Sequence, residues 1–98
     1  MATTIEQDEQ VLALRRQGLS FAAIARDLDI DRAITANRAF NRALRMRPAA
    51  EQKVVRAEEN GRLDALEARV RSRAGLTPED VERKLRNIER LRSQLMES

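Results

Sequence analysis

The chain has 98 residues, a formal net charge of +3 and 36% charged residues. It contains no cysteine and no histidine, which excludes disulfides and thiolate metal sites and removes the usual general base of enzymes. We therefore expect no enzyme: no catalytic residue, no metal site and no cofactor, and nothing in the sequence indicates a small-molecule ligand.

No segment has the pattern of a membrane-inserted or secreted chain. No run approaches the roughly 18 consecutive apolar residues of a transmembrane helix. The first residues are acidic and lack the basic-then-apolar order of a signal peptide. We therefore expect a cytoplasmic protein without a membrane partner.

Helix-favouring residues dominate the chain and no segment alternates as a strand does, so we predict an all-α fold. The first helix is expected over residues 5–17, followed by Gly18, where a positive φ costs least. The second is expected over residues 21–28, with Ser20 as its N-cap.

A third helix is predicted over residues 32–46, with Asp31 as its cap. At about 100° per residue, Phe40 lies on its apolar face. The opposite face is polar and mostly basic, and carries Thr35, Arg38, Asn41, Arg42 and Arg45.

Pro48 marks the next boundary, because proline suits the first position of a helix. Helix is expected over residues 49–59 and again over 63–74. The Asn60-Gly61 pair between them either ends one helix or is a weak point within a longer one.

A helix stop and restart follow. Gly75 ends one helix, Thr77 caps the next, and Pro78 stands at its first position. The last helix is expected to end near residue 97, so that residues 63–97 form a helical hairpin.

The hairpin carries an apolar seam whose heptad-like spacing favours an oligomerisation surface. Alternatively the seam packs within one chain, and both arrangements are compatible with half of a four-helix dimer. Arg92, at a seam position, is a candidate for pairing with Glu89 of a second copy. The seam residues are Leu63, Leu66, Val70, Val81, Leu85, Ile88 and Leu95.

Charge is unevenly distributed along the chain. Residues 1–31 have a net charge of −3, residues 32–56 of +6 and residues 57–98 of 0. The basic stretch coincides with the third helix and the segment after it. A concentrated basic patch favours a polyanionic partner.

Residues 5–46 resemble the three-helix helix-turn-helix domains of bacterial regulators, resolvases and region 4 of sigma factors. The sequence departs from that family at Asp29, where a glycine is usual, and at Thr35 and Arg38, where apolar residues are usual. The strongest matches are Gly18-Leu19-Ser20, Ile24-Ala25, Leu28 and Ile30.

The resemblance implies two domains and a DNA partner. Residues 1–47 would form a helix-turn-helix DNA-binding domain, and residues 48–98 a helical oligomerisation segment. In such domains the third helix enters the major groove of double-stranded DNA, which here is the helix over residues 32–46.

Two kinds of DNA contact are expected. Arginine pairs with guanine and asparagine with adenine, so the base-facing candidates are Thr35, Arg38, Asn41 and Arg42. The residues expected to hold phosphates are Ser20, Arg32, Arg45, Arg47, Lys53 and Arg56.

The sequence thus predicts a sequence-specific DNA-binding protein, a homodimeric transcriptional regulator associated with the nucleoid. One alternative is a phage packaging component that resembles a small terminase subunit and forms a ring. Another is an adaptor that binds the helices of other proteins and no DNA. The target sequence, the sign of regulation and the number of copies stay open.

Overall fold

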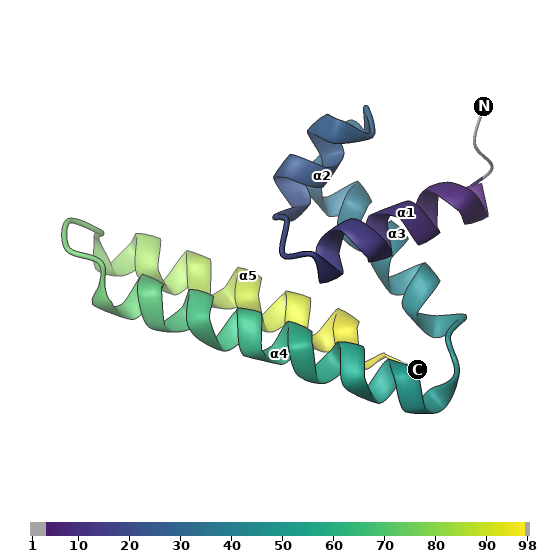
Figure 1. Ribbon diagram of the computed structural model, residues 1–98. Helices are drawn as coiled ribbons and strands as arrows, with labels where there is room; N and C mark the ends of the chain where they lie inside the picture. The colour runs from purple at the N-terminus through teal and green to yellow at the C-terminus, as the bar shows by residue number, and fades with distance from the viewer. Residues whose placement is uncertain (1–3, 98) are drawn as a thin grey trace. The chain divides into compact units, whose positions relative to one another are not determined.

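The structure, a computed structural model, describes residues 4–97 and contains five helices and no strand within that range (Figure 1). The predicted all-α fold is confirmed. The helices are α1 (Thr4–Arg16), α2 (Phe21–Asp27), α3 (Ala33–Arg45), α4 (Ala49–Ser72) and α5 (Pro78–Met96).

Contacts divide the chain into two compact units, the first ending at Val55 and the second beginning at Arg56. The division falls inside α4, later than the boundary expected after residue 47. Within residues 4–97, no helix has both the length and the apolar character needed to cross a bilayer.

The first unit is built around α3, which packs against both α1 and α2. Phe21 of α2 meets Phe40 of α3 edge to face, with 5.6 Å between ring centroids and 70° between ring planes, an arrangement that aromatic pairs favour. The guanidinium of Arg15 lies 4.3 Å from the centre of the Phe21 ring. The residues of the first unit that are no more than 1% exposed are Val11, Leu12, Ile24, Ala36, Phe40, Leu44 and Val55.

The turns on either side of α2 depend on local backbone chemistry. Gly18 has a φ of 103°, as expected for a glycine that ends a helix. Ser20 is the N-cap of α2, and its Oγ accepts a hydrogen bond from the backbone N of Ala23 at 3.1 Å. Asp29, after α2, has a φ of 56°, the left-handed conformation that aspartate tolerates better than most residues.

The start of α3 differs from the expectation. Arg32, and not Asp31, is the N-cap, and its side chain makes no capping hydrogen bond. The predicted capping role of Asp31 is therefore wrong. The first turn is closed by the backbone instead, since the carbonyl of Arg32 accepts from the N–H groups of Thr35 at 3.1 Å and Ala36 at 3.3 Å.

The long helix α4 runs without interruption through Asn60 and Gly61. The alternative of two separate helices is therefore excluded. Gly61 is exposed, and apart from the adjacent backbone of α4 no heavy atom lies within 4 Å of the position that a Cβ atom would occupy. The sequence left this question open because a lone glycine is compatible with either outcome.

The side chain of Gln52, near the start of α4, hydrogen-bonds to the end of α3 and to the link that follows it. The Nε2 of Gln52 donates to the carbonyl oxygen of Arg47 at 2.7 Å and to that of Arg45 at 3.3 Å. The backbone N of Gln52 donates to the carbonyl of Pro48 at 3.0 Å. Carbonyls left unpaired at the end of α3 thereby gain a donor.

In the second unit α5 runs back along α4 in the opposite direction (Figure 1). Gly75 has a φ of 87°. Thr77 is the N-cap of α5, its side chain accepts from the backbone N of Asp80 at 3.1 Å, and Pro78 begins the helix. The predicted stop and restart are confirmed.

Polar contacts also join α4 to α5. Arg92 reaches Asp64 Oδ1 at 2.6 Å with Nη2 and Asn60 Oδ1 at 3.3 Å with Nη1. Nε of Arg56 donates to the carbonyl of Leu95 at 2.9 Å. Arg92 therefore has its acidic partner within its own hairpin, where the sequence suggested an acid of a second copy.

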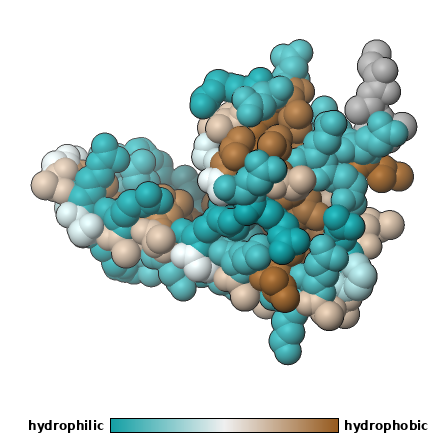
Figure 2. Space-filling view, viewed as in Figure 1, coloured by the Kyte–Doolittle hydropathy of each residue, from teal (hydrophilic) through white to brown (hydrophobic). Residues whose placement is uncertain are grey.

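The surface is mostly hydrophilic on the face shown in Figure 2, with hydrophobic residues exposed in small groups. Some exposed hydrophobic side chains are normal in folded proteins, because apolar atoms contribute more than half of the accessible surface. The large ones are Ile5, Met46, Val54, Leu66 and Met96.

Candidate nucleic-acid interface

The four predicted base-facing residues of α3 lie in different environments. Thr35 and Arg38 are exposed. Asn41 is only 6% exposed, and its Nδ2 donates to the carbonyl oxygen of Asn37 at 3.2 Å and to its Oδ1 at 3.3 Å. Its predicted position on the exposed face is therefore wrong. Because α3 packs against two helices, its buried arc is wider than the single face assigned to it.

Arg42, the fourth of these residues, is bound to α1. Its Nε donates to Oδ2 of Asp8 and its Nη2 to Oδ1, both at 2.9 Å. The side chain of Asp8 is 9% exposed and that of Arg42 is 47% exposed. The hydrogen bond with Asp8 raises the pKa of Arg42 above its ordinary value, against the lowering effect of burial. Arg42 is thus a permanently charged link between two helices.

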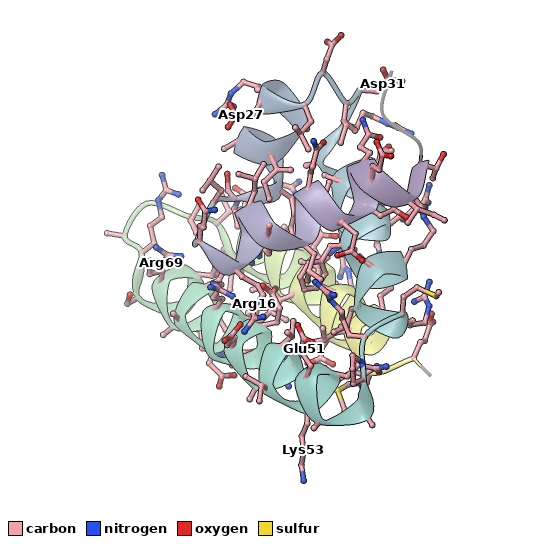
Figure 3. All side chains as sticks on the ribbon, turned by 45° about the vertical axis from the view of Figure 1, so that its right-hand side comes forward. Arg16, Asp27, Asp31, Glu51, Lys53 and Arg69 are labelled. Atoms are coloured by element: carbon pink, nitrogen blue, oxygen red, sulfur yellow. The ribbon has the colours of Figure 1, made fainter. Side chains whose placement is uncertain are left out.

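Arg47, one of the predicted phosphate contacts, is also paired. Its Nη2 lies 3.0 Å from Oε2 of Glu9, and its Nε lies 3.5 Å from Oε1 of Glu51. Glu51 is shared with Arg16, at 3.5 Å, and Figure 3 shows these two side chains close together between α1 and α4. Part of the positive charge of residues 32–56 is therefore balanced within the first unit.

Four cations of the same stretch remain without an ion pair among the described residues. Arg38 and Arg45 are seven residues apart, so they lie on one stripe of α3, two turns from each other. Figure 3 shows Lys53 extending away from α4. The four are Arg32, Arg38, Arg45 and Lys53, and all are exposed.

Two further predicted phosphate contacts already have structural roles. The Oγ of Ser20 caps α2. Arg56, at the start of the second unit, uses Nε to bind the carbonyl of Leu95 and Nη2 to reach that of Glu97 at 3.5 Å. A phosphate would compete with these interactions for the same groups.

Acidic residues surround the turn before α3. Asp27, Asp29 and Asp31 are all exposed, and Figure 3 shows Asp27 and Asp31 on either side of the link between α2 and α3. Carboxylates near a helix N-terminus interact favourably with its dipole. They also repel phosphates that approach the same end of α3.

The sequence interpretation missed the acidic partners in α1. Asp8 precedes Val11 and Leu12 by three and four residues, so helical geometry puts it on their buried face. A buried carboxylate requires a cation or several donors. That spacing was the available signal, but it does not reveal that Arg42 is the partner.

The predicted oligomerisation residues fall into two groups. Leu63, Val70, Ile88 and Leu95 are at most 7% exposed. Val81 and Leu85 are partly exposed, and Leu66 is 36% exposed. Only the second group has side-chain area accessible to another molecule.

The part of the chain that the structure describes contains no group of three or more acidic residues placed to hold a metal ion. Comparisons of the chain with models of protein families, with characterised proteins and with solved structures return no match.

Proposed function

We propose that the first unit is a helix-turn-helix domain and that the protein is a sequence-specific DNA-binding transcriptional regulator. The observation that carries this proposal is the set of exposed cations without an ion pair on and around α3. Arg38 and Arg45 form a stripe along that helix, and the other two, Arg32 and Lys53, precede and follow this stripe in the sequence. Unpaired arginines on one helix stripe suit a major groove lined by phosphates.

The local geometry is consistent with this proposal. A capped short helix, a turn with a left-handed residue at Asp29 and a third helix packed on the first two are the parts of such a domain. Arg38 is then the leading base-reading residue, with Thr35 beside it. Arg32, Arg45 and Lys53, the other exposed cations of this set, are assigned to phosphates.

The salt dependence of DNA binding tests the proposal. Neutralising about four phosphates should give a log–log slope of affinity against salt near −3.6, a loss of about two orders of magnitude between about 50 and 200 mM salt. Fluorescence anisotropy of a labelled duplex provides the measurement. A flat response would exclude DNA binding and support an adaptor that binds only proteins.

A matched pair of variants assigns the effect to the unpaired cations. Arg45→Ala should reduce the size of the slope by about 1, because one phosphate contact is lost. Arg47→Ala removes the same charge from a residue already paired with Glu9 and Glu51, so its effect should be smaller. Equal effects would show that the ion pairs do not decide which cations meet DNA.

We also propose that the second unit joins two copies, so that the dimer reads two half-sites. Val81 and Leu85 retain exposed apolar area, and Val81→Ser with Leu85→Ser should convert the dimer to a monomer. Sedimentation equilibrium gives the mass. A monomeric wild type would exclude the dimer, and a ring of about eight or more copies would favour a packaging role.

A further inference from the structure

An open apolar groove lies between α4 and α5, near the link that joins them. It has a volume of about 740 Å³, which is in the range of ligand-binding clefts. Leu66, Leu76 and Leu91 line it with accessible surface, above the buried Val70 and Ile88. All of these residues belong to the second unit, so the groove is a feature of the hairpin itself.

The charged residues that line this groove are all basic. Arg69, Arg73 and Lys84 contribute to the lining, and no acidic residue does. Among residues 4–97, none of these three cations forms an ion pair. Figure 3 shows Arg69 projecting from α4 near its end. The groove therefore combines apolar area with an uncompensated positive rim.

Two acids of the hairpin pair with cations that lie outside the groove lining. Glu67 on α4 lies 3.9 Å from Arg71, and Asp80 on α5 lies 2.7 Å from Arg83. Neither acid forms an ion pair with Arg69, Arg73 or Lys84. An acidic partner would supply the counter-charge that these three cations lack among the described residues.

We propose that this groove binds an acidic amphipathic helix of a partner protein. Leucines three and four residues apart on such a helix would cover Leu66, Leu76 and Leu91, and flanking Glu or Asp residues would meet the rim. Charge complementarity of this kind sets partner choice and the rate of association. The proposal is independent of DNA binding by the first unit.

Two other occupants fit the groove less well. Duplex DNA would satisfy Arg69, Arg73 and Lys84, but it presents phosphates and no apolar helix face to cover the leucines. A second copy of the groove would bring three cations against three cations, and opposed like charges are strongly unfavourable at an interface. An acidic amphipathic helix would cover the leucines with its apolar face and pair its carboxylates with the three cations.

A pair of synthetic helical peptides tests this inference on the full chain. Both carry leucine on one face; one has Glu on its flanks and the other has Lys. By fluorescence anisotropy, the wild-type chain should bind the Glu peptide about tenfold tighter than the Lys peptide. The double variant Arg69→Glu with Arg73→Glu should reverse the preference. Equal binding of both peptides by wild type, or an unchanged preference in this variant, would overturn the proposal.

A control variant separates the groove from overall charge. Arg86→Glu with Arg90→Glu changes the net charge by the same amount on exposed residues of α5 outside the lining, so the peptide preference should persist. Loss of the preference in this control would show a nonspecific charge effect. Leu91→Ser should weaken binding of the Glu peptide, and unchanged binding would exclude the apolar surface as part of the site.

The same variants exclude the other occupants. If Arg69→Glu with Arg73→Glu weakens binding of a duplex as much as binding of the Glu peptide, the groove belongs to a nucleic-acid interface and the proposal fails. If Leu91→Ser converts a dimer to a monomer in sedimentation, a second copy occupies the groove and the proposal also fails. Circular dichroism checks that each variant keeps its helical content. If Leu91→Ser unfolds, the peptide preference of Arg69→Glu with Arg73→Glu, both at exposed positions, tests the proposal instead.

Discussion

Arg42 of α3 holds Asp8 of α1 through two hydrogen bonds of 2.9 Å, from Nε to Oδ2 and from Nη2 to Oδ1. Such a two-pronged pair fixes the orientation of both side chains as well as their separation. The pair sets one helix of the first unit against another. Arg42, although it lies on the polar stripe of α3, therefore has a structural role.

Removing the partner of Arg42 should therefore lower stability. Asp8→Asn keeps the shape of the side chain but loses its charge, and should lower the free energy of unfolding by about 1–2 kcal/mol. Thermal unfolding followed by circular dichroism measures the effect. Glu9→Gln is the matched control, because Glu9 and Arg47 are both more than a third exposed, and it should cost less than about 1 kcal/mol. Equal losses would contradict a special role for the Asp8–Arg42 pair.

Sequence preference should depend on Arg38 and not on Lys53. Arg38→Ala is expected to relax base discrimination at one position by about 1–3 kcal/mol. Lys53→Ala should weaken binding to all sequences by a similar factor, because a phosphate contact carries no sequence information. Binding to a library of randomised duplexes distinguishes the two outcomes. The same uniform loss from both variants would argue against base reading by α3.

The acidic turn before α3 should oppose DNA binding. Asp31→Asn removes one of three exposed carboxylates there, and affinity for a duplex at low salt should rise by about two- to fivefold. Glu82→Gln, an equal change at an exposed acid of the second unit, should have a smaller effect. The gain should shrink as salt is added, since screening reduces the repulsion that Asp31 exerts. An affinity unaffected by Asp31→Asn would place DNA away from this turn.

Backbone strain at Asp29 predicts a stabilising substitution. Asp29 has a φ of 56°, a conformation that costs residues with a Cβ about 1–2 kcal/mol and glycine almost nothing. Asp29→Gly should therefore raise the free energy of unfolding by about 0.5–1 kcal/mol. Asp27→Gly, at the last residue of α2, should lower it. Urea unfolding measures the free energy of unfolding of both variants. If Asp29→Gly does not stabilise the protein, Asp29 is not strained.

Because α4 is continuous through Gly61, alanine is expected to be preferred over glycine at that position. Alanine is favoured over glycine in a helix interior by about 0.5–1 kcal/mol, and a Cβ there meets no neighbouring atom. Gly61→Ala should therefore stabilise the protein and raise its helical content. Gly18→Ala makes the same chemical change at a φ of 103° and should destabilise it. If Gly61→Ala were destabilising, α4 would be broken in solution.

Local signals in the sequence predicted the helix ends well. Ser20 and Thr77 cap the helices that follow them, and Gly18 and Gly75 adopt positive φ, because these preferences depend on only a few neighbouring residues. Asp31 shows the limit of this approach. An aspartate one residue too early has the right chemistry for a cap but not the right position.

The candidate interface was predicted less completely, because tertiary packing decides it. Phe40 was correctly placed in the core, but a helical wheel drawn around it assumes one buried face. With α1 and α2 both packed on α3, Asn41 lies inside the buried arc. The partner of Arg42 lies 34 positions earlier in the chain, and no local pattern connects the two.

The division of the α3 region into paired and unpaired cations constrains how its sequence can change over generations. Arg38 and Arg45 have no ion-pair partner among the described residues, so exchanging either side chain singly should mainly change what the surface binds. Arg42 and Asp8 are tied together, so a lineage that alters one of them is expected to alter the other. Reversing both charges would preserve the attraction, and relatives of this protein should show correlated substitution at these two positions and independent substitution at the others.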